Sequence, residues 1–384
     1  MSFIIQDLSS DKGEVKNARR IGATQPLITA DGMLIGDGDG NVRAAGKDDF
    51  VLLGDPYIGV DLTQKYSMEI GLYSDEWAWI KARIQSGNFA GIHVADYIPV
   101  VANGDTYKAR IIGINTYKGY GDTEIENHID FIFEELWPVS RSVNLINNNN
   151  GLIPVESVIA DGTSTTFVLE KEMNSISKIE MNNAELSGWT YDESTYTITF
   201  ETAPASGTMT VTGTGTEFPW LASDAYHFVN SLSGQVASAD NGVKHVDYTQ
   251  SGIYYYFPQK LKDVIIPKRF YAPKRYSTSG VLSSTNDAGF TDLGNVWFLS
   301  ETEVYGQSIR STSNYDSSGS VQYPYFSYSM NRVKKQGANR RGYWLMAPAN
   351  GSSASWCCVT SSGFAISYVS SYAYMYYHVC FRVA

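Results

Sequence analysis

The chain of 384 residues carries a formal net charge of −11 with a pI near 5, and 43% of its residues are hydrophobic. The acidic balance argues against a nucleic-acid-binding protein, which needs Lys and Arg clustered on one face. The 27 tyrosines and 34 glycines argue against a helical bundle and favour strands, turns and polar aromatic surface. The composition therefore predicts an all-β or α+β protein of extracellular or virion type.

Residues 1–60 are rich in glycine and turn formers, and residues 30–43 are expected to form short strands joined by Asp-Gly turns. Three side chains there resemble the start of a calcium-binding loop: Asp37, Asp39 and Asn41. Val42 occupies the place of the sharp-turn glycine and Asp48 that of the bidentate glutamate, so a hairpin is favoured over a calcium site. We interpret residues 1–60 as a β-rich attachment or oligomerisation segment.

Residues 61–150 contain a helix signal at 74–87, with Ser74 as the predicted N-cap and Gly87 as the terminator. Its apolar face is predicted to consist of Trp77, Ile80 and Ile84. Two strands are expected at residues 97–101 and 107–115, joined by a turn at Asn103-Gly104. A further apolar run covers residues 129–137.

The asparagine-rich stretch at residues 147–151 marks a boundary. Beyond it, alternation of polar and apolar residues predicts short strands at 165–169, 176–181, 196–200 and 208–212. This spacing is typical of a small antiparallel sandwich of immunoglobulin-like type. We interpret residues 151–216 as such a module, acting as a spacer and carrying no chemistry.

Residues 217–384 begin with a predicted helix at 223–232, capped by Ser223. Its apolar face is predicted to consist of Phe228, Val229 and Leu232. One more short helix is expected within residues 254–265, and only strands and loops are expected after Val281. The longest basic run, residues 331–341, is interpreted as a solvated loop.

The three cysteines are Cys357, Cys358 and Cys380. An odd, clustered set is no disulfide framework, so buried thiols and folding in a reducing cytoplasm are expected. The first residues lack the basic and long apolar regions of a signal peptide, and no apolar run approaches 18 residues. A particle released by lysis would reconcile these features with a surface-binding role.

Four motifs follow one another in the second half: VWFLSETEVYG (296–306), QYPYF (322–326), NRVKK (331–335) and YWLMAP (343–348). This series resembles C-type-lectin-fold domains common in phages and gut bacteria. DYIPV (96–100) and IIGIN (111–115) resemble the opening half of the same family. The resemblance covers roughly residues 70–140 and 217–384. It implies an α+β, C-type lectin-like fold in two halves, residues 61–150 and 217–384, separated by the inserted sandwich.

The stretch at residues 361–378 is similar to the variable region of proteins that diversity-generating retroelements mutate, a family that includes phage tropism determinants. In that family, adenine-rich codons are mutated while the lectin fold holds the backbone. Residues 379–384 resemble the fixed strand that closes the fold. A family member with a fixed binding site would have a similar sequence.

Ten of the eighteen residues at 361–378 are Ser or Tyr, which is the composition of a binding surface. Alternation predicts that the tyrosines face outward while Val369, Ala373 and Met375 anchor the other face. The alternative is that the tyrosines pack in an edge sheet or a subunit interface. The candidate ligand-contacting residues are Asn339, Ser352, Ser353, Ser355, Trp356, Thr360, Ser362, Tyr368, Ser370, Tyr372, Tyr374, Tyr376, Tyr377 and His378.

The five histidines lack metal-ligand spacing, so neither a metal nor another cofactor is expected. The densest polar cluster is Asp122, Glu124, His128 and Asp130. For it, local turn and cap hydrogen bonds are favoured over metal binding or acid–base work. Glu301 and Glu303, expected on one face of a strand, resemble the carboxylate pair of a glycosidase. The lectin-like resemblance implies instead that this motif is structural, with its carboxylates bonded to loop backbone, so we expect no enzyme.

The resemblance implies a phage receptor-binding protein at a tail-fibre tip, baseplate or capsid surface. Its expected partners are a host cell-surface protein or glycan and, through the N-terminal segment, other virion proteins. We expect a homotrimer, without nucleic-acid binding or membrane insertion. The alternative is a structural virion protein, a capsid decoration or baseplate subunit, whose tyrosines make subunit contacts. A glycan-processing enzyme is a third possibility.

Overall fold

The chain divides into two units, residues 1–58 and 59–384. The computed structural model describes residues 58–384 except 124, 149, 240–241, 276–286 and 312–319, and, in the smaller unit, three strands. These strands, β1 (Leu27–Thr29), β2 (Gly32–Gly36) and β3 (Val42–Ala44), form an antiparallel sheet. The Asp-Gly turns and the calcium-like residues Asp37, Asp39, Asn41 and Asp48 lie outside the described residues.

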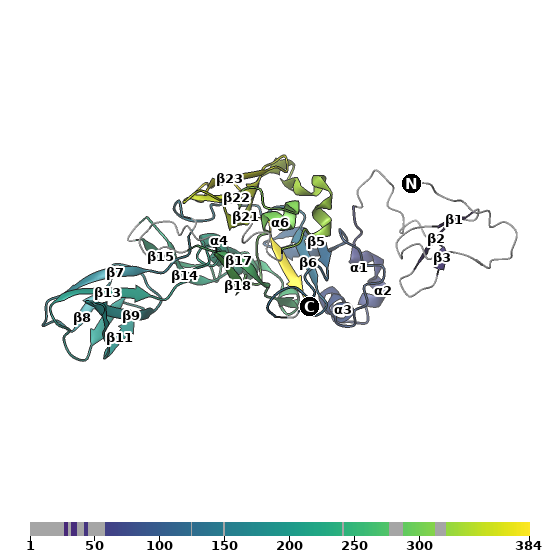
Figure 1. Cartoon of the computed structure of the whole chain (residues 1–384). Coiled ribbons are helices and arrows are strands. Elements are labelled where there is room, and N and C mark those ends of the chain that lie inside the picture. Colours follow the sequence, from purple (N-terminus) through teal and green to yellow (C-terminus); the bar gives the residue numbers. More distant parts are fainter. Residues whose placement is uncertain are drawn as a thin grey trace. The chain divides into compact units, whose positions relative to one another are not determined.

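The larger unit is built on a five-stranded antiparallel sheet in the order β16-β24-β6-β5-β4 (Figure 1). Its strands are β4 (Tyr97–Ala102), β5 (Asp105–Ile114), β6 (Ile129–Phe133), β16 (Ile265–Ile266) and β24 (Cys380–Val383). Every residue of β6 and β24 is buried. The sheet thus joins strands from both ends of this unit, with the apolar run of β6 at its centre.

The hairpin of β4 and β5 has the predicted turn. Asn103 and Gly104 have φ angles of 50° and 82°, both in the left-handed region. Two left-handed residues make the two-residue turn that matches the twist of antiparallel strands. This short-range prediction is confirmed, because the turn chemistry alone determines the pairing of Ala102 with Asp105.

Six short α-helices flank the sheets among the described residues: α1 (Leu62–Lys65), α2 (Ser67–Ile70), α3 (Glu76–Gln85), α4 (Asp224–Asn230), α5 (Gln259–Lys262) and α6 (Glu301–Tyr305). The N-cap of α3 is Asp75 and not Ser74, because the Asp75 carboxylate accepts hydrogen bonds from the backbone of Trp77 and Ala78. Ser223 caps α4 as predicted.

The apolar helix faces are largely as predicted. Trp77, Ile80 and Ile84 are buried, as are Phe228 and Val229. Leu232 is 37% exposed, because α4 ends at Asn230 and Ser231 turns the chain with a φ of 56°. The described residues also include three 3-10 helices: η2 (Tyr254–Tyr256), η3 (Pro324–Ser327) and η4 (Ser329–Arg332).

The expectation of strands and loops only after Val281 is wrong, since residues 301–305 form α6. Ser300 caps this helix by accepting from the backbone of Glu303, while the Glu303 side chain accepts from the backbone of Ser300. This reciprocal capping box supplies partners for two backbone N–H groups at a helix start. Glu301 and Glu303 therefore lie in a helical first turn and not on a strand.

Residues 152–216 form two sheets around a core of their own. One sheet has the order β10-β9-β13-β7 and the other β11-β12-β8. The strands are β7 (Val155–Ala160), β8 (Thr166–Val168), β9 (Ile176–Met181), β10 (Ala184–Glu185), β11 (Trp189–Asp192), β12 (Thr197–Phe200) and β13 (Gly207–Gly213). Phe167, Ile179 and Val211 are among the residues buried between them.

The two ends of this segment meet. Leu152 and Thr216 exchange two backbone hydrogen bonds of 2.8 and 2.9 Å. The segment also touches the hairpin of β14 (Ser233–Ala237) and β15 (Val243–Asp247), where Gln235 contacts the backbone of Asn174 and Thr214. Residues 152–216 thus leave and rejoin the rest of the unit at one point.

The remaining strands lie in the second half. β17 (Arg269–Lys274) pairs with β18 (Asp287–Asp292), and β19 (Lys334–Gln336) pairs with β20 (Asn339–Arg341). A three-stranded antiparallel sheet contains β21 (Tyr343–Pro348), β22 (Ser355–Val359) and β23 (Ala365–Val369). Antiparallel sheets with short helices make the chain a β-rich protein of the mixed α+β class. No helix among the described residues is long and apolar enough to cross a membrane.

Candidate ligand-binding surface

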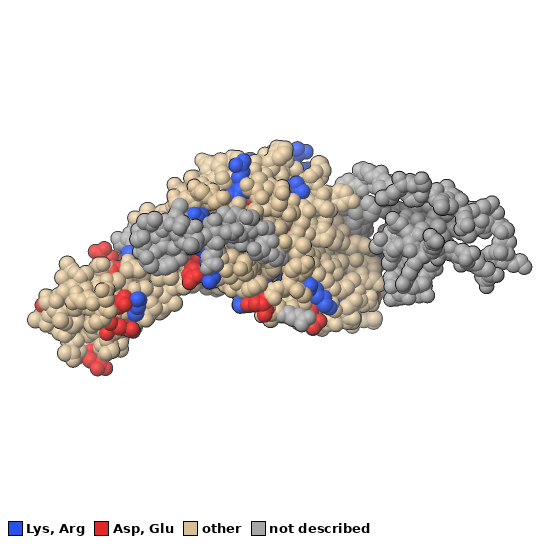
Figure 2. All heavy atoms as spheres, in the orientation of Figure 1, with Lys and Arg blue, Asp and Glu red and all other residues tan. Residues whose placement is uncertain are grey.

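Most of the predicted contact residues lie in the sheet β21-β22-β23 or in the loops beside it, and ten of the fourteen are at least partly exposed. The exposed residues are Asn339, Ser353, Ser362 and Tyr374, and the partly exposed ones are Ser352, Ser355, Thr360, Tyr368, Tyr372 and Tyr376. β23 pairs only with β22, so it forms an edge of the sheet. The sequence after Glu303 has seven Lys or Arg and one acidic residue, Asp316. On the face drawn in Figure 2, most of the surface around these strands is uncharged, and the charged side chains seen there are chiefly Lys and Arg.

Four predicted contact residues are buried and do not belong to this surface: Trp356, Ser370, Tyr377 and His378. The Trp356 indole donates to the Asn148 carbonyl at 3.2 Å, and the Ser370 hydroxyl donates to the Ile146 carbonyl at 2.9 Å. These hydrogen bonds connect β22 and the residue that follows β23 to the loop that contains Ile146 and Asn148.

Tyr377 and His378 are buried because the chain enters the central sheet just before β24. The Tyr377 ring lies 4.9 Å from Phe298, and its hydroxyl donates to the Ser142 carbonyl. The His378 Nε2 atom donates to the Phe133 carbonyl at 2.9 Å, and burial lowers the pKa of this imidazole well below its usual range. Alternation of polar and apolar residues therefore does not predict the burial of Tyr377 and His378.

Three exposed tyrosines touch one another and form the tyrosine cluster: Tyr368, Tyr372 and Tyr374. The rings of Tyr368 and Tyr372 stack at 4.7 Å with an interplanar angle of 21°, and those of Tyr372 and Tyr374 lie 5.3 Å apart. Tyr374 is 76% exposed. Stacked rings restrict one another, so the cluster presents a pre-ordered aromatic face.

The predicted anchors of the opposite face are only partly right. Met375 is buried, whereas Val369 is 41% exposed and Ala373 is exposed. The stretch after β23 is a turn and not a strand, since the Tyr372 backbone N–H donates to the Val369 carbonyl. A turn does not place alternate residues on opposite faces, which explains the two errors.

A loop from the first half of the unit holds this turn in place. The Asn148 backbone N–H donates to the Ser370 hydroxyl at 2.8 Å, and the Ser371 hydroxyl donates to the Asn147 side chain at 2.6 Å. The backbone N–H groups of Val143 and Asn144 both donate to the Ser370 carbonyl. The asparagine run, read in the sequence only as a boundary, thus supports the tyrosine cluster, and its dense amide groups were the signal for that role.

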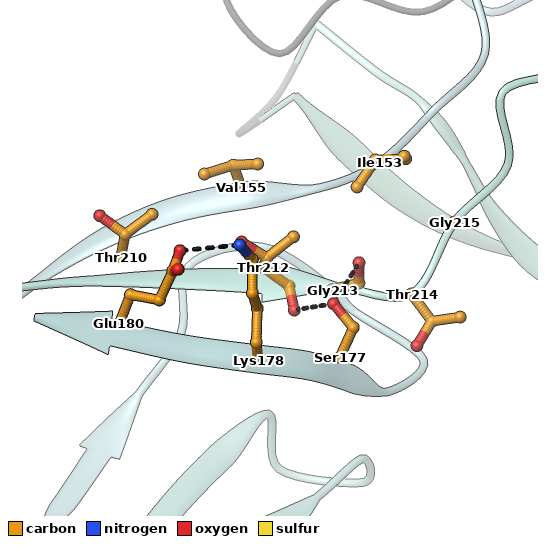
Figure 3. Close-up of a pocket in the computed structure, with 10 residues that line it drawn as sticks. All are labelled: Ile153, Val155, Ser177, Lys178, Glu180, Thr210, Thr212, Gly213, Thr214 and Gly215. Atoms are coloured by element: carbon orange, nitrogen blue, oxygen red, sulfur yellow. Dashed lines mark hydrogen bonds and ion pairs between the residues drawn. The ribbon is translucent and has the colours of Figure 1, made fainter. Parts of the chain in front are cut away.

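The inserted segment carries a hollow of about 540 Å³ on the outer face of β7, β9 and β13 (Figure 3). Lys178 and Glu180 point into it and form an ion pair at 2.9 Å, and the Ser177 hydroxyl donates to the Thr212 carbonyl at 2.9 Å. The residues that line it include neither a histidine nor a cysteine, and the charges of Lys178 and Glu180 neutralise each other.

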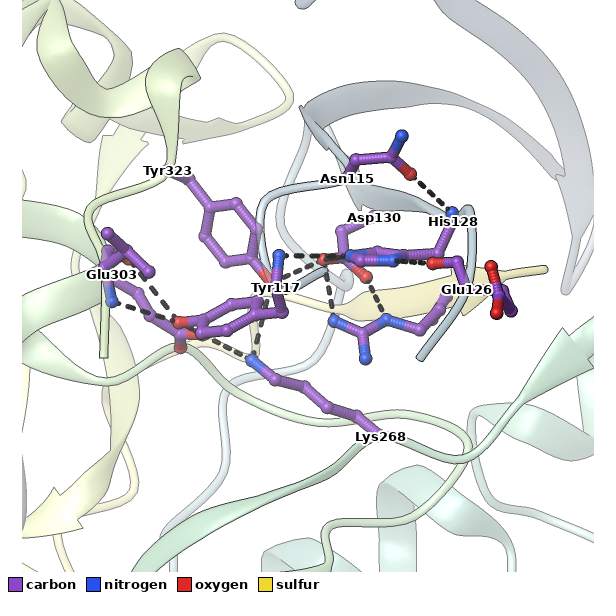
Figure 4. Close-up of polar contacts among 10 residues, drawn as sticks. Asn115, Tyr117, Glu126, His128, Asp130, Lys268, Glu303 and Tyr323 are labelled. Carbon is purple, nitrogen blue, oxygen red and sulfur yellow. Dashed lines mark hydrogen bonds and ion pairs between the residues drawn. The ribbon is translucent and has the colours of Figure 1, made fainter. Parts of the chain in front are cut away.

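A buried ionic network lies under the central sheet (Figure 4). The Asp130 carboxylate accepts two hydrogen bonds from the Arg382 guanidinium, at 2.6 and 2.9 Å, and one from the Tyr323 hydroxyl at 2.8 Å. Glu303 accepts from Lys268 and from the Tyr117 hydroxyl. The four charged side chains are at least 98% buried, and their charges sum to zero. Each charge therefore has a buried partner of opposite sign, which fits a structural role.

His128 is held neutral beside this network. Its Nε2 atom accepts from the Tyr117 backbone N–H at 3.2 Å, which leaves Nδ1 to donate to the Glu126 carbonyl at 3.1 Å. Burial lowers the pKa of this imidazole. Both ring nitrogens have partners, so His128 is not available as a metal ligand or as a base for an external substrate.

The remaining acid–base candidates also have internal partners. Asp122 forms a bidentate pair with Arg269, at 2.7 Å for the shortest contact. One Glu301 oxygen accepts from the backbone of Ile309, Arg310 and Ser311 at 2.7–2.8 Å. The implied bonding of this glutamate to loop backbone is confirmed. Glu124 lies outside the described residues, and among the residues described no group of three His, Cys, Asp or Glu could hold a metal ion.

The three cysteines are free thiols, and all are buried as predicted. Burial raises the pKa of Cys358 and Cys380. The basic run at 331–341 is not a loop as predicted: it spans η4 and the β19-β20 hairpin, and Lys334 is buried against Tyr325.

One family profile, described as a domain of unknown function (DUF6273), matches residues 220–384. The match begins near Trp220, after the inserted segment, and contains the tyrosine cluster and the β19-β20 hairpin. No curated protein and no solved structure in the comparison matches the chain.

Proposed function

We propose that the chain is a receptor-binding protein of phage type that grips a host-surface molecule with the tyrosine cluster. The observation that carries this proposal is the exposed stack of Tyr368, Tyr372 and Tyr374 on a turn that is fixed from beneath. Tyrosine offers large contact area at low entropic cost, and neighbouring Ser and Gly provide adaptable hydrogen bonds. The three rings lie on a turn that is hydrogen-bonded to the loop at residues 143–148. Such a surface can bind a ligand without any catalytic group.

In this proposal the larger unit is a C-type lectin-like domain, with residues 152–216 as an immunoglobulin-like insertion. The sheet that joins β24 to β6 supports the first part, because it closes strands from both halves into one body. The separate core and the joined ends of the insertion support the second. The smaller unit then attaches the protein to a virion, and a homotrimer multiplies a modest affinity of each site.

The test is binding of the labelled full-length protein to a panel of bacterial strains. Y372A/Y374A should weaken binding about 30-fold or more, since truncating a central aromatic contact costs about 2 kcal/mol or more. The matched control is Y120A/Y255A, which removes two other exposed tyrosines and should leave binding within about twofold. Unchanged binding by folded Y372A/Y374A would refute the proposal.

The same variants test the structural alternative. If the tyrosines make subunit contacts in a capsid decoration or baseplate, Y372A/Y374A should change the sedimentation of the purified oligomer and not its binding to cells. A receptor-binding surface predicts the reverse, an unchanged oligomer with reduced binding.

Diversification by a retroelement is a separate part of the proposal. Deep sequencing of codons 339–378 across a population of the source should show substitutions at adenine positions, concentrated in exposed residues. The buried residues Trp356 and Tyr377 should be invariant because they hold the platform. A uniform sequence would retain the binding proposal with a fixed specificity.

A further inference from the structure

The β19-β20 hairpin concentrates positive charge in a protein of net charge −11. Lys335, Arg340 and Arg341 are exposed on it. None of them takes part in an ion pair formed by the described residues, although Lys108, Arg110 and Arg269 each have a carboxylate partner. The chain has 40 acidic residues and places none in this hairpin.

The cations also face one another across the ladder. Lys335 lies directly opposite Arg340, and Lys334 lies opposite Arg341. Like charges directly opposite on antiparallel strands destabilise the pairing. Two successive like-charge pairs are therefore a cost to folding that an anionic partner would offset.

The nearest carboxylates by chain contact do not neutralise the hairpin. The Leu136 backbone N–H donates to the Lys335 carbonyl, which brings the segment of Glu134 and Glu135 alongside. Glu134 is occupied by Arg110 at 2.8 Å and by Lys108 at 3.5 Å. Glu135 forms no ion pair with any described residue. Neither glutamate therefore pairs with a cation of the hairpin.

The hairpin is continuous with the turn that carries the tyrosine cluster. The Arg341 guanidinium lies over the Tyr376 ring, 5.8 Å from its centre. The Tyr376 backbone N–H donates to the Gly342 carbonyl at 3.0 Å. Residues 372–376 and β20 are therefore fixed to each other, and Arg341 lies next to the turn that carries the tyrosine cluster.

We infer that the β19-β20 hairpin is the anion-recognising edge of the binding surface and that its partner is a protein with a Glu- or Asp-rich segment. This inference rests on the proposed function. Lys, Arg and hydroxyl donors dominate the surface, so it fits a ligand rich in carboxylate and carbonyl acceptors. A neutral glycan would gain nothing from the net positive charge of this hairpin, whereas a carboxylate-rich ligand forms charge-assisted hydrogen bonds with it. Tyr and Arg together are the residues enriched in energetically dominant protein–protein contacts.

The experiment measures fluorescence anisotropy of labelled poly-L-glutamate with the full-length protein at about 20 and 150 mM NaCl, where screening lengths differ about threefold. We expect binding that weakens with salt and falls at least tenfold in R340E and in K335E. The matched control is K244E, which reverses an exposed cation on β15 that forms no ion pair with a described residue, and it should change the affinity less than twofold.

Misfolding is separated from loss of binding by thermal unfolding of the same variants. R340E and K335E each replace a like-charge pair by an opposite-charge pair, so their melting temperatures should equal or exceed that of the wild type. Loss of poly-L-glutamate binding with an unchanged or raised melting temperature supports the inference.

Two results would overturn it. One is equal affinity of R340E and the wild type for poly-L-glutamate. The other is equal or tighter binding of alginate, a carboxylate polysaccharide, at matched charge concentration, since the surface would then favour an acidic glycan. If either result is found while Y372A/Y374A still weakens binding to cells, only the inference of an anionic partner is refuted. If Y372A/Y374A does not weaken binding to cells, the proposed function itself is refuted.

Discussion

At the scale of single residues, Asp130 is a charged side chain whose burial depends on its hydrogen-bond partners. Its side chain is fully buried and accepts three hydrogen bonds, two from Arg382 and one from Tyr323. A buried ion pair is weak evidence for net stability, but breaking one leaves an uncompensated charge in the core. Asp130 and Arg382 are 252 residues apart in sequence, so this pairing also joins the two halves of the unit.

We expect D130N to lower the free energy of unfolding by about 3–5 kcal/mol, because Arg382 would remain charged and buried. Urea denaturation of the full-length protein measures this. The matched control is D122N, which breaks the solvent-exposed pair with Arg269 and should lower the free energy of unfolding far less. Equal effects of the two substitutions would contradict the role assigned to the buried network.

The same residue predicts an acid dependence. Burial raises the pKa of Asp130, but the Arg382 guanidinium outweighs it and lowers this pKa from 3.8 to about 2. A carboxyl group whose pKa is lower in the folded than in the unfolded state stabilises the protein fully at a pH above the unfolded-state pKa. This stabilisation is lost as the pH falls from the unfolded-state pKa through the folded-state pKa. The wild type should therefore lose about 2 kcal/mol between pH 4 and pH 2 from this group, and D130N should lack that loss. Denaturation curves at pH 5, 4, 3 and 2 check this, with D122N as the control.

The sequence predicted the position of a residue correctly where its neighbours in the chain determine it. The prediction failed where residues far away in the sequence determine it. The Ser223 cap and the buried cysteines followed from residue type and neighbours. The burial of Tyr377 depends on Phe298 and Ser142, which no local pattern brings near it. The same holds for Asp130, whose partner Arg382 is in the last strand.

At the scale of elements, α6 shows how one missed signal changes a functional reading. Ser300 and Glu303 have the spacing of a capping box, which marks a helix start in the sequence alone. Reading the stretch as a strand placed Glu301 and Glu303 on one face, as in a glycosidase. In the helix, Glu301 instead holds the loop at Ile309–Ser311 by three backbone hydrogen bonds.

We expect E301A to cost about 2 kcal/mol, because it leaves three backbone N–H groups without their acceptor. E301Q should cost less, since its amide oxygen can replace the Glu301 oxygen that accepts all the bonds. E185Q, an exposed site on β10, is the matched control and should be neutral. Chemical denaturation measures the free energy of unfolding of the three variants. A larger loss of stability in E301Q than in E301A would contradict the role of Glu301 as an acceptor for the loop backbone.

At the scale of the whole molecule, the joined ends of residues 152–216 predict that this segment is dispensable for folding of the rest. Leu152 and Thr216 face each other as an antiparallel pair, so an Asn-Gly turn can join them directly. We expect the variant with residues 153–215 replaced by Asn-Gly to unfold cooperatively and to bind cells as the wild type does. Circular dichroism melting and the strain-panel assay check both, and loss of cell binding in a folded variant would make the insertion part of the binding surface.

The position of β24 affects how the protein is made. β24 lies between β6 and β16, yet it follows β6 by about 250 residues of translation. At 5–20 residues per second, the apolar strand β6 waits about 13–50 s on the ribosome for its neighbour. An unpaired apolar edge is a template for pairing with other nascent chains during that time. Yield of the protein should therefore depend on translation speed and on chaperones that cover β6 until residues 380–383 emerge.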